Sequence, residues 1–550
     1  MKSNIDTEYM SIKSSHFLLI VVAIILGSFL RLFQITDQVV ADDEWHSIHA
    51  LLFREYNQIF TSFGISDHCI PLTVFYKFLS ETIGLSETLM RFPQLFFGII
   101  AIFIFPIFCR EIINRKGMVI FALLLSISPL LIFFSRYIRP YSITVFLSFI
   151  GVMAFYKWWV GGKKKYAFLY VVCAALGSYF HLVVIPFLLA PFLFATGQLF
   201  FTEYLKRVSE LKRILKLAIV TLISIVILVG PPLYMNYFSI EKKIDAQTPS
   251  VSIVVHTATL FSGTSSLVLT GILFIISIFG LSKIFYKEKP FALYMAVISL
   301  THLLSILFIR PSGIVLGTIL ARYLLPVLPV FLLLVSIGLA EIRFFFNRRV
   351  HSFSVLLSTV FLCSLLFYFG PIPRTYYHPN NWTNHMIFQA NYNKAENAYV
   401  KYLKPKQIPG FYYKLGSLKA NSITIVEAPW RYEWQANELP FYQMIHKQKT
   451  LIGFVNDLCA DEKFRLLEIP KESKGMNFKN YVFLSDYEKV ISKGVEYIIF
   501  HKTMRGDKFS DTDGTPIDVL KCKTKIAENF GEPVLEEQDI IVYQIKKTVF

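Results

Sequence analysis

Long apolar runs recur along the chain from residue 16 to about residue 371. Each run is about 17–21 residues long, which is the length that an α-helix needs to cross a bilayer. The first run is longer than the apolar core of a typical signal peptide and has no small-residue cleavage site after it, which favours a retained helix. The pattern predicts eleven spans, at residues 16–34, 92–109, 118–134, 141–157, 166–181, 182–201, 217–237, 266–286, 291–309, 322–340 and 352–371.

Lysine and arginine are distributed unequally about these predicted spans. If the N-terminus is cytoplasmic, 20 of them fall on the cytoplasmic side and 10 on the outer side up to residue 371. Cytoplasmic loops of membrane proteins carry this excess of positive charge. The sequence therefore predicts an N-terminus inside and, because the number of spans is odd, residues 372–550 outside.

Composition supports the same class of protein. The chain is 54% hydrophobic and 16% aromatic, with 53 phenylalanines, which is too apolar for a soluble globular protein. The net charge of +17 is explained by membrane orientation, so we expect no nucleic-acid partner. Membrane lipids are the expected surroundings of residues 1–371.

The C-terminal region has a different character. Residues 372–550 contain 25 Lys and Arg against 21 Asp and Glu, and no apolar run long enough to span. Short β-rich runs alternate there with polar stretches that suit helices. The chain is thus expected to be an α-helical polytopic membrane domain, 1–371, followed by an extracytoplasmic α/β domain, 372–550; the β-rich runs include 422–426, 495–500 and 540–545.

Cysteine usage indicates neither a zinc site nor a disulfide framework, because the six cysteines include no C-x-x-C pair. Cys459 and Cys522 both lie in the polar C-terminal region. They are either two unrelated thiols or a disulfide pair, if that region lies in an oxidising compartment.

The first outer loop, residues 35–91, carries candidate acids. Asp42-Asp43-Glu44-Trp45-His46 places three carboxylates together shortly after the first span. In isolation such a triplet is as well explained by a solvated loop. Residues 45–60 and 69–82 look amphipathic, however, and are predicted to lie as helices along the membrane interface, holding the acids at the surface. Asp67-His68 lies between them and supplies a second acid/base pair.

Three further outer segments carry side chains that suit a phosphate. An arginine side chain at a helix end can simply reach toward water, and a lone histidine there is more often structural. The positive-inside bias nevertheless disfavours arginine on this face, and the guanidinium fork matches phosphate oxygens. The candidate phosphate ligands are Arg136, Arg139, Tyr141, His181, Arg322 and Tyr323.

These candidates are all predicted to lie on one membrane face. No acidic or basic side chain falls in the middle of a predicted span. A transporter or flippase, the alternative function, would place ionisable groups near the midplane or show matched half-repeats. The arrangement favours a surface active site for an amphiphilic, phosphate-bearing substrate over that alternative and over a non-catalytic scaffold.

Six short motifs, in order through residues 16–340, resemble the GT-C superfamily of membrane glycosyltransferases. The likeness is to bacterial protein O-mannosyltransferases, lipid A aminoarabinose transferases and Rgt-type transferases. The C-terminal region resembles the ectodomains of such enzymes only vaguely. Cys69-Ile70 departs from the more Pro-rich stretch of the family. The matching motifs are Asp43-Glu44, Asp67-His68-Cys69-Ile70-Pro71-Leu72, Arg91-Phe92-Pro93, Arg139-Pro140-Tyr141, Tyr179-Phe180-His181 and Arg322-Tyr323-Leu324-Leu325-Pro326.

The resemblance implies an enzyme of the bacterial plasma membrane that uses a polyprenyl-phosphate sugar as donor. The acceptor would be a hydroxyl of a lipid, glycan or protein, deprotonated by Asp43, with attack on the anomeric carbon and inversion. Glu44, Asp67 and His68 complete the implied catalytic set, and the arginines stabilise the departing phosphate. A divalent metal near Asp43, Glu44 and Asp67 is compatible with this set, but the spacing is not diagnostic of one.

Overall fold

The computed structural model describes residues 2–550 except for 34, 37, 39, 41, 53, 65–68, 202, 238–246, 343–347, 371–406, 430–438, 456–457, 460–476, 503–517 and 546–550. Contacts divide the chain into two units, which are described separately. The first comprises Met1–Phe33, Arg54–Val74 and Arg91–Pro371. The second comprises Gln34–Phe53, Phe75–Met90 and Ile372–Phe550, so it includes two parts of the predicted outer loop as well as the C-terminal region.

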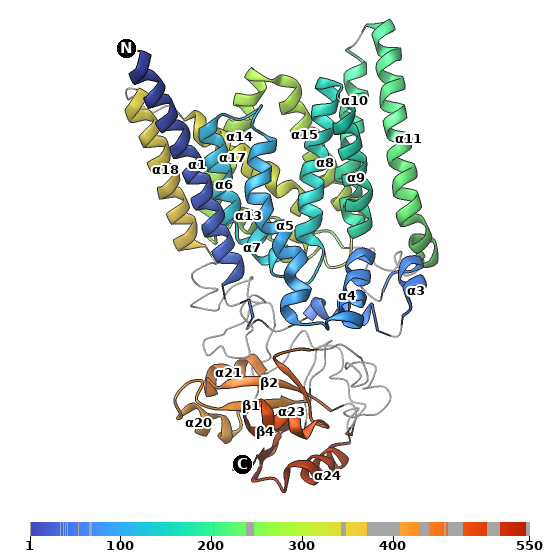
Figure 1. The fold of residues 1–550 in the computed structure, drawn as a ribbon, viewed down its shortest axis with the longest axis vertical. Coiled ribbons are helices and arrows are strands. Elements are labelled where there is room, and N and C mark those ends of the chain that lie inside the picture. The colour runs from blue at the N-terminus through green and yellow to red at the C-terminus, as the bar shows by residue number, and fades with distance from the viewer. Residues whose placement is uncertain are drawn as a thin grey trace. The chain divides into compact units, whose positions relative to one another are not determined.

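The first unit is helical (Figure 1). Among the described residues, six helices are long and apolar enough to cross a membrane, or up to eight if two bent pairs each count as one span. The protein is therefore a polytopic membrane protein, while the number of eleven spans stays a prediction. The first and last predicted spans correspond to shorter apolar stretches, Phe17–Leu32 and Leu357–Phe369.

The helices of the chain outside the C-terminal region have these bounds: α1 Lys2–Leu32, η1 Asp42–Glu44, α2 Trp45–His49, α3 Tyr56–Thr61, α4 Ile70–Thr82, α5 Glu87–Phe108, α6 Arg115–Ile127, α7 Pro129–Ser135, α8 Tyr141–Gly161, α9 Lys164–Phe180, η2 Leu182–Val184, α10 Ile185–Leu199, α11 Tyr204–Met235, α13 Val251–Ser262, α14 Leu267–Lys287, α15 Lys289–Ile309, α16 Gly317–Tyr323, η3 Leu325–Val327, α17 Leu328–Glu341 and α18 Arg348–Phe369.

Two predicted spans are broken helices. Helices α6 and α7 meet at 58°, and α16 meets the helix Leu325–Glu341 at 61°. Pro129 begins α7, and Ser128 before it is extended with ψ 115°. Proline has no N–H to donate and pushes the preceding residue out of the helical region. The single straight helix expected over residues 118–134 is therefore divided at Ser128.

Helices α14 and α17 approach closely through two glycines. A Cβ on Gly280 would lie 2.0 Å from the carbonyl oxygen of Leu334, and one on Gly338 would lie 2.3 Å from that of Ile276. Neither distance is sterically allowed, so only glycine permits this backbone separation. Small residues serve the same purpose in other membrane helix pairs.

The apolar residues of the outer loop do not form one interfacial helix over 45–60. Helix α2 ends at His49, and a new helix, α3, begins after Glu55, whose side chain and that of Gln58 form a capping box. Trp45 and Ile48 have no exposed surface and belong to the second unit. The predicted helix over 69–82 is present as α4.

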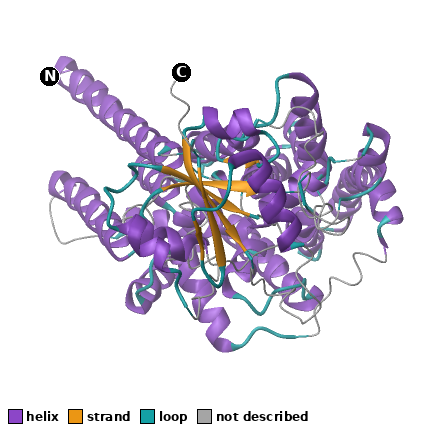
Figure 2. Cartoon of the chain, turned by 90° about the horizontal axis from the view of Figure 1, so that it is seen from below, coloured by secondary structure: helices purple, strands orange, loops and turns teal. Residues whose placement is uncertain are grey.

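The second unit contains a six-stranded sheet, shown in orange in Figure 2. Its strand order is β3-β2-β1-β4-β6-β5, with parallel pairing from β3 to β4 and antiparallel pairing of β6 with both β4 and β5. The expected α/β region is thus present, and three of its strands fall on the β-rich runs. The elements are α20 Gly410–Gly416, β1 Thr424–Ala428, α21 Leu439–His446, β2 Lys449–Phe454, β3 Tyr481–Phe483, α23 Tyr487–Ser492, β4 Val495–His501, α24 Val519–Phe530, β5 Leu535–Glu536 and β6 Ile540–Gln544.

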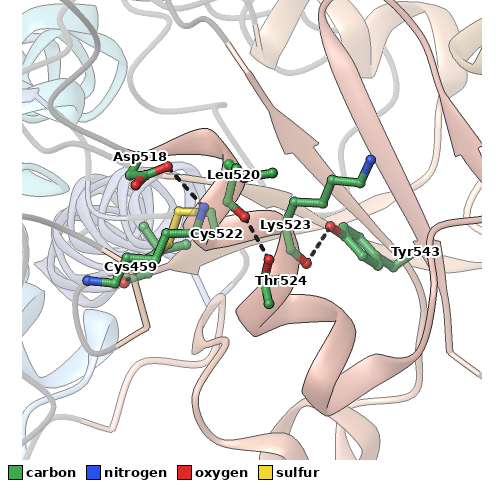
Figure 3. The surroundings of a disulfide bond; sticks show 9 residues. Cys459, Asp518, Leu520, Cys522, Lys523, Thr524 and Tyr543 are labelled. Carbon is green, nitrogen blue, oxygen red and sulfur yellow. Dashed lines mark hydrogen bonds between the residues drawn. A yellow bond between two sulfur atoms is a disulfide. The ribbon is translucent and has the colours of Figure 1, made fainter.

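Cys459 and Cys522 form a disulfide between the segment after β2 and helix α24 (Figure 3). Both residues lie in the buried apolar core of this unit, with exposed fractions of 3% and 0%. Of the two alternatives that the sequence left open, the structure shows the paired one. Disulfides persist in oxidising compartments, so the pair accords with an extracytoplasmic location for this region.

Candidate active site

The acidic segment of the outer loop forms a short turn, η1, that leads directly into α2. Asp43 is 21% exposed, and its Oδ1 lies 3.7 Å from Nε2 of His46. Glu44, one residue later, is completely buried. Of Asp43 and Glu44, only Asp43 is therefore accessible to a substrate.

The two histidines of α2 differ in their surroundings. Burial, together with the nearby His46, lowers the pKa of His49 to about 3, so His49 is neutral at physiological pH. His46 is partly exposed and faces Asp43. When protonated, His46 favours the ionised form of the Asp43 carboxylate, since an opposite charge at short range stabilises a carboxylate.

Arg136 has partners other than a phosphate. It is completely buried, and its guanidinium donates to the carbonyl oxygens of Phe33 (2.7 Å) and Leu30 (3.4 Å) at the end of α1. The last carbonyls of a helix have no partner within the helix. Arg136 caps α1, and we leave it out of the phosphate site for which the sequence proposed it.

Two buried arginines hold the turn that carries Arg136 and Arg139. Nε of Arg91 donates to the carbonyl of Arg136 at 2.8 Å. Arg31 donates to the carbonyls of Leu125 (3.1 Å) and Ser126 (3.2 Å) and to Oγ of Ser135 (3.2 Å). These three hydrogen bonds span the helix break.

The carbonyl of Leu125 is the group that an unbroken helix would pair with the N–H of residue 129, which is a proline. Arg31 thus replaces the missing donor. Sequence reasoning did not assign this role to Arg31, which counted only as an outer-side charge, and Arg91 entered only as part of a family motif.

Four predicted residues come together at the ends of α8, α9 and α16, and we call them the Arg322 cluster (Tyr141, His181, Arg322 and Tyr323). Cζ of Arg322 lies 5.5 Å from the ring centroids of both Tyr141 and Tyr323, a cation–π distance. The rings of Tyr141 and His181 are 5.3 Å apart. Side chains from three of the separate segments therefore lie together within the first unit, while Asp43 belongs to the second unit.

Hydrogen bonds fix two members of the Arg322 cluster. The N–H of Val183 donates to Nδ1 of His181 (3.2 Å), so a neutral His181 carries its proton on Nε2. The hydroxyl of Tyr323 donates to the carbonyl of Ser312 (3.1 Å). Arg139 is 6% exposed and precedes Tyr141 by two residues in the same turn. Asp67 and His68 lie outside the described residues.

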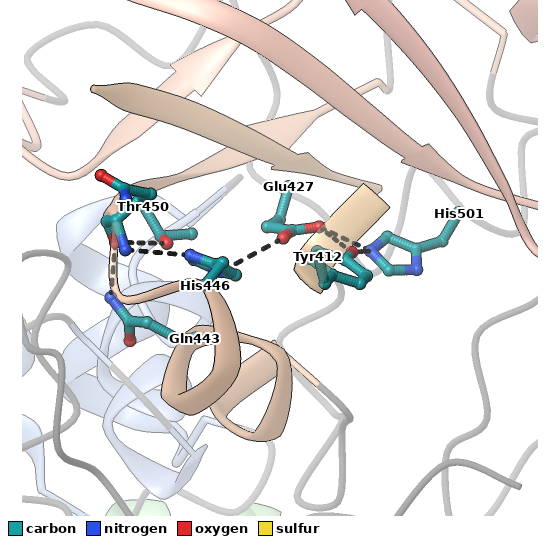
Figure 4. Close-up of polar contacts among 7 residues, drawn as sticks. Tyr412, Glu427, Gln443, His446, Thr450 and His501 are labelled. Atoms are coloured by element: carbon teal, nitrogen blue, oxygen red, sulfur yellow. Dashed lines mark hydrogen bonds and ion pairs between the residues drawn. The ribbon is translucent and has the colours of Figure 1, made fainter. Parts of the chain in front are cut away.

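A second polar cluster, which the sequence analysis did not propose, lies within the sheet unit (Figure 4). Oε2 of Glu427 lies 2.6 Å from Nε2 of His501 and accepts a hydrogen bond from the Tyr412 hydroxyl (3.0 Å). Glu427 and His501 lie at the carboxyl ends of neighbouring parallel strands, a frequent place for ligands in α/β sheets. Nε2 of His446 is 3.9 Å from Oε1 of Glu427. All of these side chains are buried, so we assign the cluster to the core of the domain.

The described residues do not favour a metal site. Among them, no group of three or more His, Cys, Asp or Glu side chains is arranged to hold a metal ion. Glu44 is completely buried and Asp43 lies 3.7 Å from His46, while Asp67 is outside the described residues. No step below is assigned to a metal.

No family model matches the chain, and no curated protein matches it. Solved structures do. ArnT from Cupriavidus metallidurans aligns in its apo state with a TM-score of 0.48 and 11% identity, over 97% of this chain and 98% of that chain. Bound to undecaprenyl phosphate, it aligns with a TM-score of 0.46 and 12% identity over the same shares.

The archaeal oligosaccharyltransferase AglB from Archaeoglobus fulgidus, in complex with an inhibitory peptide and a dolichol-phosphate, aligns with a TM-score of 0.43 and 11% identity. The match covers 89% of this chain and 69% of that chain. At TM-scores below 0.5 these likenesses carry no argument about function, which is argued below from the chain's own residues.

Proposed function

We propose that the protein is a membrane glycosyltransferase that moves a sugar from a polyprenyl-phosphate donor to a hydroxyl of a lipid, glycan or protein. The observation that carries the proposal is the Arg322 cluster, in which a partly buried guanidinium lies beside two tyrosine rings where three helices end. Arginine is a side chain of choice for binding phosphate groups, because its guanidinium fork matches phosphate oxygens. The phosphate of an amphiphilic lipid is a suitable partner.

The phosphate is assigned to Arg322 and Arg139. The guanidinium fork gives two parallel hydrogen bonds to phosphate oxygens. The rings of Tyr141 and Tyr323 restrict the Arg322 side chain, so less freedom is lost when the donor binds. During transfer, negative charge develops on the phosphate, and positive groups already in place stabilise it without reorganisation.

Asp43 is proposed as the general base. Its carboxylate takes the proton of the acceptor hydroxyl as that oxygen bonds to the anomeric carbon. The bond from the anomeric carbon to the phosphate oxygen breaks, and polyprenyl phosphate leaves with the electron pair, which inverts the anomeric centre. His46, 3.7 Å from Asp43, can stabilise the Asp43 carboxylate when its imidazole is protonated.

The proposed location is the outer face of the bacterial plasma membrane. Two features support it: the excess of Lys and Arg on the opposite side, and the disulfide of the C-terminal region.

Purified protein in lipid vesicles, incubated with a panel of labelled polyprenyl-phosphate sugars and candidate acceptors, tests the proposal. Release of polyprenyl phosphate together with a labelled acceptor is the expected result, and Asp43→Asn should abolish most of it. Labelled donor that crosses the vesicle membrane without cleavage would instead favour the transport alternative.

A further inference from the structure

The turn that carries Asp43 is held by the C-terminal region of the chain. Trp45, two residues after Asp43, has no exposed surface. Its ring lies 5.3 Å from that of Tyr481, 6.0 Å from that of Phe454 and 6.1 Å from that of Phe478. All three partners stand edge-on to Trp45, the arrangement that aromatic quadrupoles favour.

Hydrogen bonds join the same two parts of the second unit. The hydroxyl of Tyr481 donates to the carbonyl of Val40, three residues before Asp43. The ring of Tyr481 therefore packs against Trp45, which follows the acidic turn in the chain, while its hydroxyl binds Val40, which precedes the turn. We call Phe454, Phe478 and Tyr481 the aromatic clamp.

The chain around the clamp is also fixed at the second loop segment. The carboxylate of Glu87 accepts hydrogen bonds from the backbone N–H groups of Lys479 (3.0 Å) and Asn480 (3.1 Å). The N–H of Asn477 donates to the carbonyl of Leu85 at 2.7 Å. Residues 477–481 thus contact both parts of the outer loop that belong to the second unit.

A lysine of the sheet domain also stabilises the segment that carries two of the clamp residues. Nζ of Lys493 donates to the carbonyls of Phe478 (3.2 Å) and Tyr481 (3.0 Å). The segment that carries two clamp residues is therefore held by its own domain as well as by the loop.

We propose that Trp45 and Tyr481 are positioning residues for sugar transfer, and that the C-terminal domain acts by fixing the acidic turn through the aromatic clamp. The inference rests on the proposed function of Asp43. A base must be held within hydrogen-bond reach of the proton that it removes, and a displacement of about 1 Å can cost about 10²-fold in rate. The domain thereby contributes to catalysis without touching the substrate.

Trp45→Ala and Tyr481→Phe test the inference in the full chain. The first removes the ring that the three clamp residues contact. It should lower kcat at least about tenfold, because the backbone beside Asp43 loses its support. The second removes one hydrogen bond to Val40 and should lower kcat by about two- to tenfold. The donor KM should stay within about twofold of wild type in both variants, because the phosphate ligands are untouched. Trp45→Phe, which keeps an aromatic ring in the clamp, should restore most of the rate.

Tyr543→Phe is the matched control. Tyr543 lies in β6 of the same sheet, and its hydroxyl likewise donates to a carbonyl, that of Lys523 in α24 (3.2 Å). The variant should leave kcat unchanged. Hydrogen–deuterium exchange of peptides covering residues 38–52 gives a second readout, which should rise in Trp45→Ala and Tyr481→Phe but not in the control.

Unchanged exchange of the 38–52 peptides in both clamp variants would overturn the inference, because the clamp would not be holding the turn. Increased exchange with an unchanged kcat would overturn the positioning role. If wild-type protein transfers no sugar from any donor, the proposed function fails and the positioning role with it, while the exchange data still decide whether the domain fixes the turn.

Discussion

Adjacent acidic residues in this chain have opposite surroundings. Asp43 is partly exposed beside His46, whereas Glu44 is completely buried. A motif shows that two carboxylates are neighbours, but not which of them turns outward, because that depends on the packing of Trp45 against residues more than 400 positions away. The sequence proposes the pair, and the structure separates its members by their exposure.

Asp43→Asn tests the base. The loss of a general base typically costs about 10²–10⁴-fold in rate. We expect this variant to bind donor normally and to turn over at least about a hundredfold more slowly, measured as single-turnover transfer at saturating donor. Asp42→Asn should be milder, because it removes a neighbouring charge and not the proton acceptor. Near-normal transfer by Asp43→Asn, with a loss in Asp42→Asn or Asp67→Asn, would assign the base to another carboxylate.

The arginines that the sequence proposed as phosphate ligands also differ in their surroundings. The sequence selected Arg136, Arg139 and Arg322 for one reason, their charge on the outer side. In the structure Arg136 caps α1, while Arg322 lies between tyrosine rings. The carbonyls that Arg136 satisfies come from about a hundred residues earlier in the chain, so no local pattern marks them.

Arg322→Lys and Arg139→Lys test the phosphate site. An ammonium cannot reproduce the guanidinium fork or its stacking on a ring, so each variant should bind donor lipid at least about tenfold more weakly. Donor affinity is measured directly, by titration with labelled lipid. Arg213→Lys is the matched control, since Arg213 also stacks on an aromatic ring, that of Trp158 at 4.3 Å, but on the predicted cytoplasmic side. Unchanged affinity in both test variants would leave the two arginines as anchors only.

At the scale of elements, hydrophobic periodicity predicted where helices and strands occur but not where helices break. Runs 422–426, 495–500 and 540–545 correspond to β1, β4 and β6. The bend between α6 and α7 depends on Pro129 together with a donor distant in sequence, Arg31. Arg31 binds a buried carbonyl that the break leaves without its helical partner, and a buried carbonyl without a hydrogen bond would be destabilising. Likewise, the pattern assigned the apolar side of residues 45–60 to the membrane interface, whereas the C-terminal region covers Trp45.

Arg31→Leu tests the support of the broken helix. The change leaves the buried carbonyls of Leu125 and Ser126 without their arginine donor, which costs about 1–3 kcal/mol for each unsatisfied group. We expect a lower thermal unfolding temperature in detergent and weaker donor binding, since α7 leads directly to the turn of Arg139. Ser135→Ala, which removes only one of the partners of Arg31, should have a much smaller effect. An unchanged unfolding temperature in Arg31→Leu would contradict the assigned role.

Two buried histidines make the second unit sensitive to acid. Burial lowers the pKa of His446 to about 3, against about 6.5 in an unfolded chain. Between these values the unfolded state binds more protons, so stability falls as the pH drops from about 6.5 toward 3. His49 contributes in the same direction.

Exchange protection of the β2 peptides, corrected for the intrinsic rate at each pH, should therefore decrease from pH 7.5 to pH 5. His446→Asn keeps an acceptor for the N–H of Gln448, which His446 Nδ1 provides at 3.0 Å, and should show a smaller decrease. An equal decrease in the variant and in wild type would exclude His446 as a source of the acid sensitivity.

For the whole molecule, two independent kinds of evidence bear on orientation. The distribution of Lys and Arg depends on how the chain is inserted. The disulfide between Cys459 and Cys522 depends on the redox state of the compartment that the C-terminal region reaches. The side assigned to the sheet unit also depends on the predicted number of eleven spans, whereas the described helices include six clear candidates and two bent pairs. A change of one span would reverse the side on which the sheet unit lies.

Reporter fusions at Lys164, at the start of α9, and at Lys419, in the sheet unit, test the orientation directly. We expect the first to report the cytoplasm and the second the outer side. Alkylation of denatured protein from intact cells should find Cys459 and Cys522 protected until a reductant is added, and the four other cysteines reactive, since those four are free thiols. A cytoplasmic signal at Lys419 together with freely alkylated Cys459 would refute the odd number of spans. It would also remove the outer-face location from the proposed reaction, because Asp43 belongs to the same unit as the sheet.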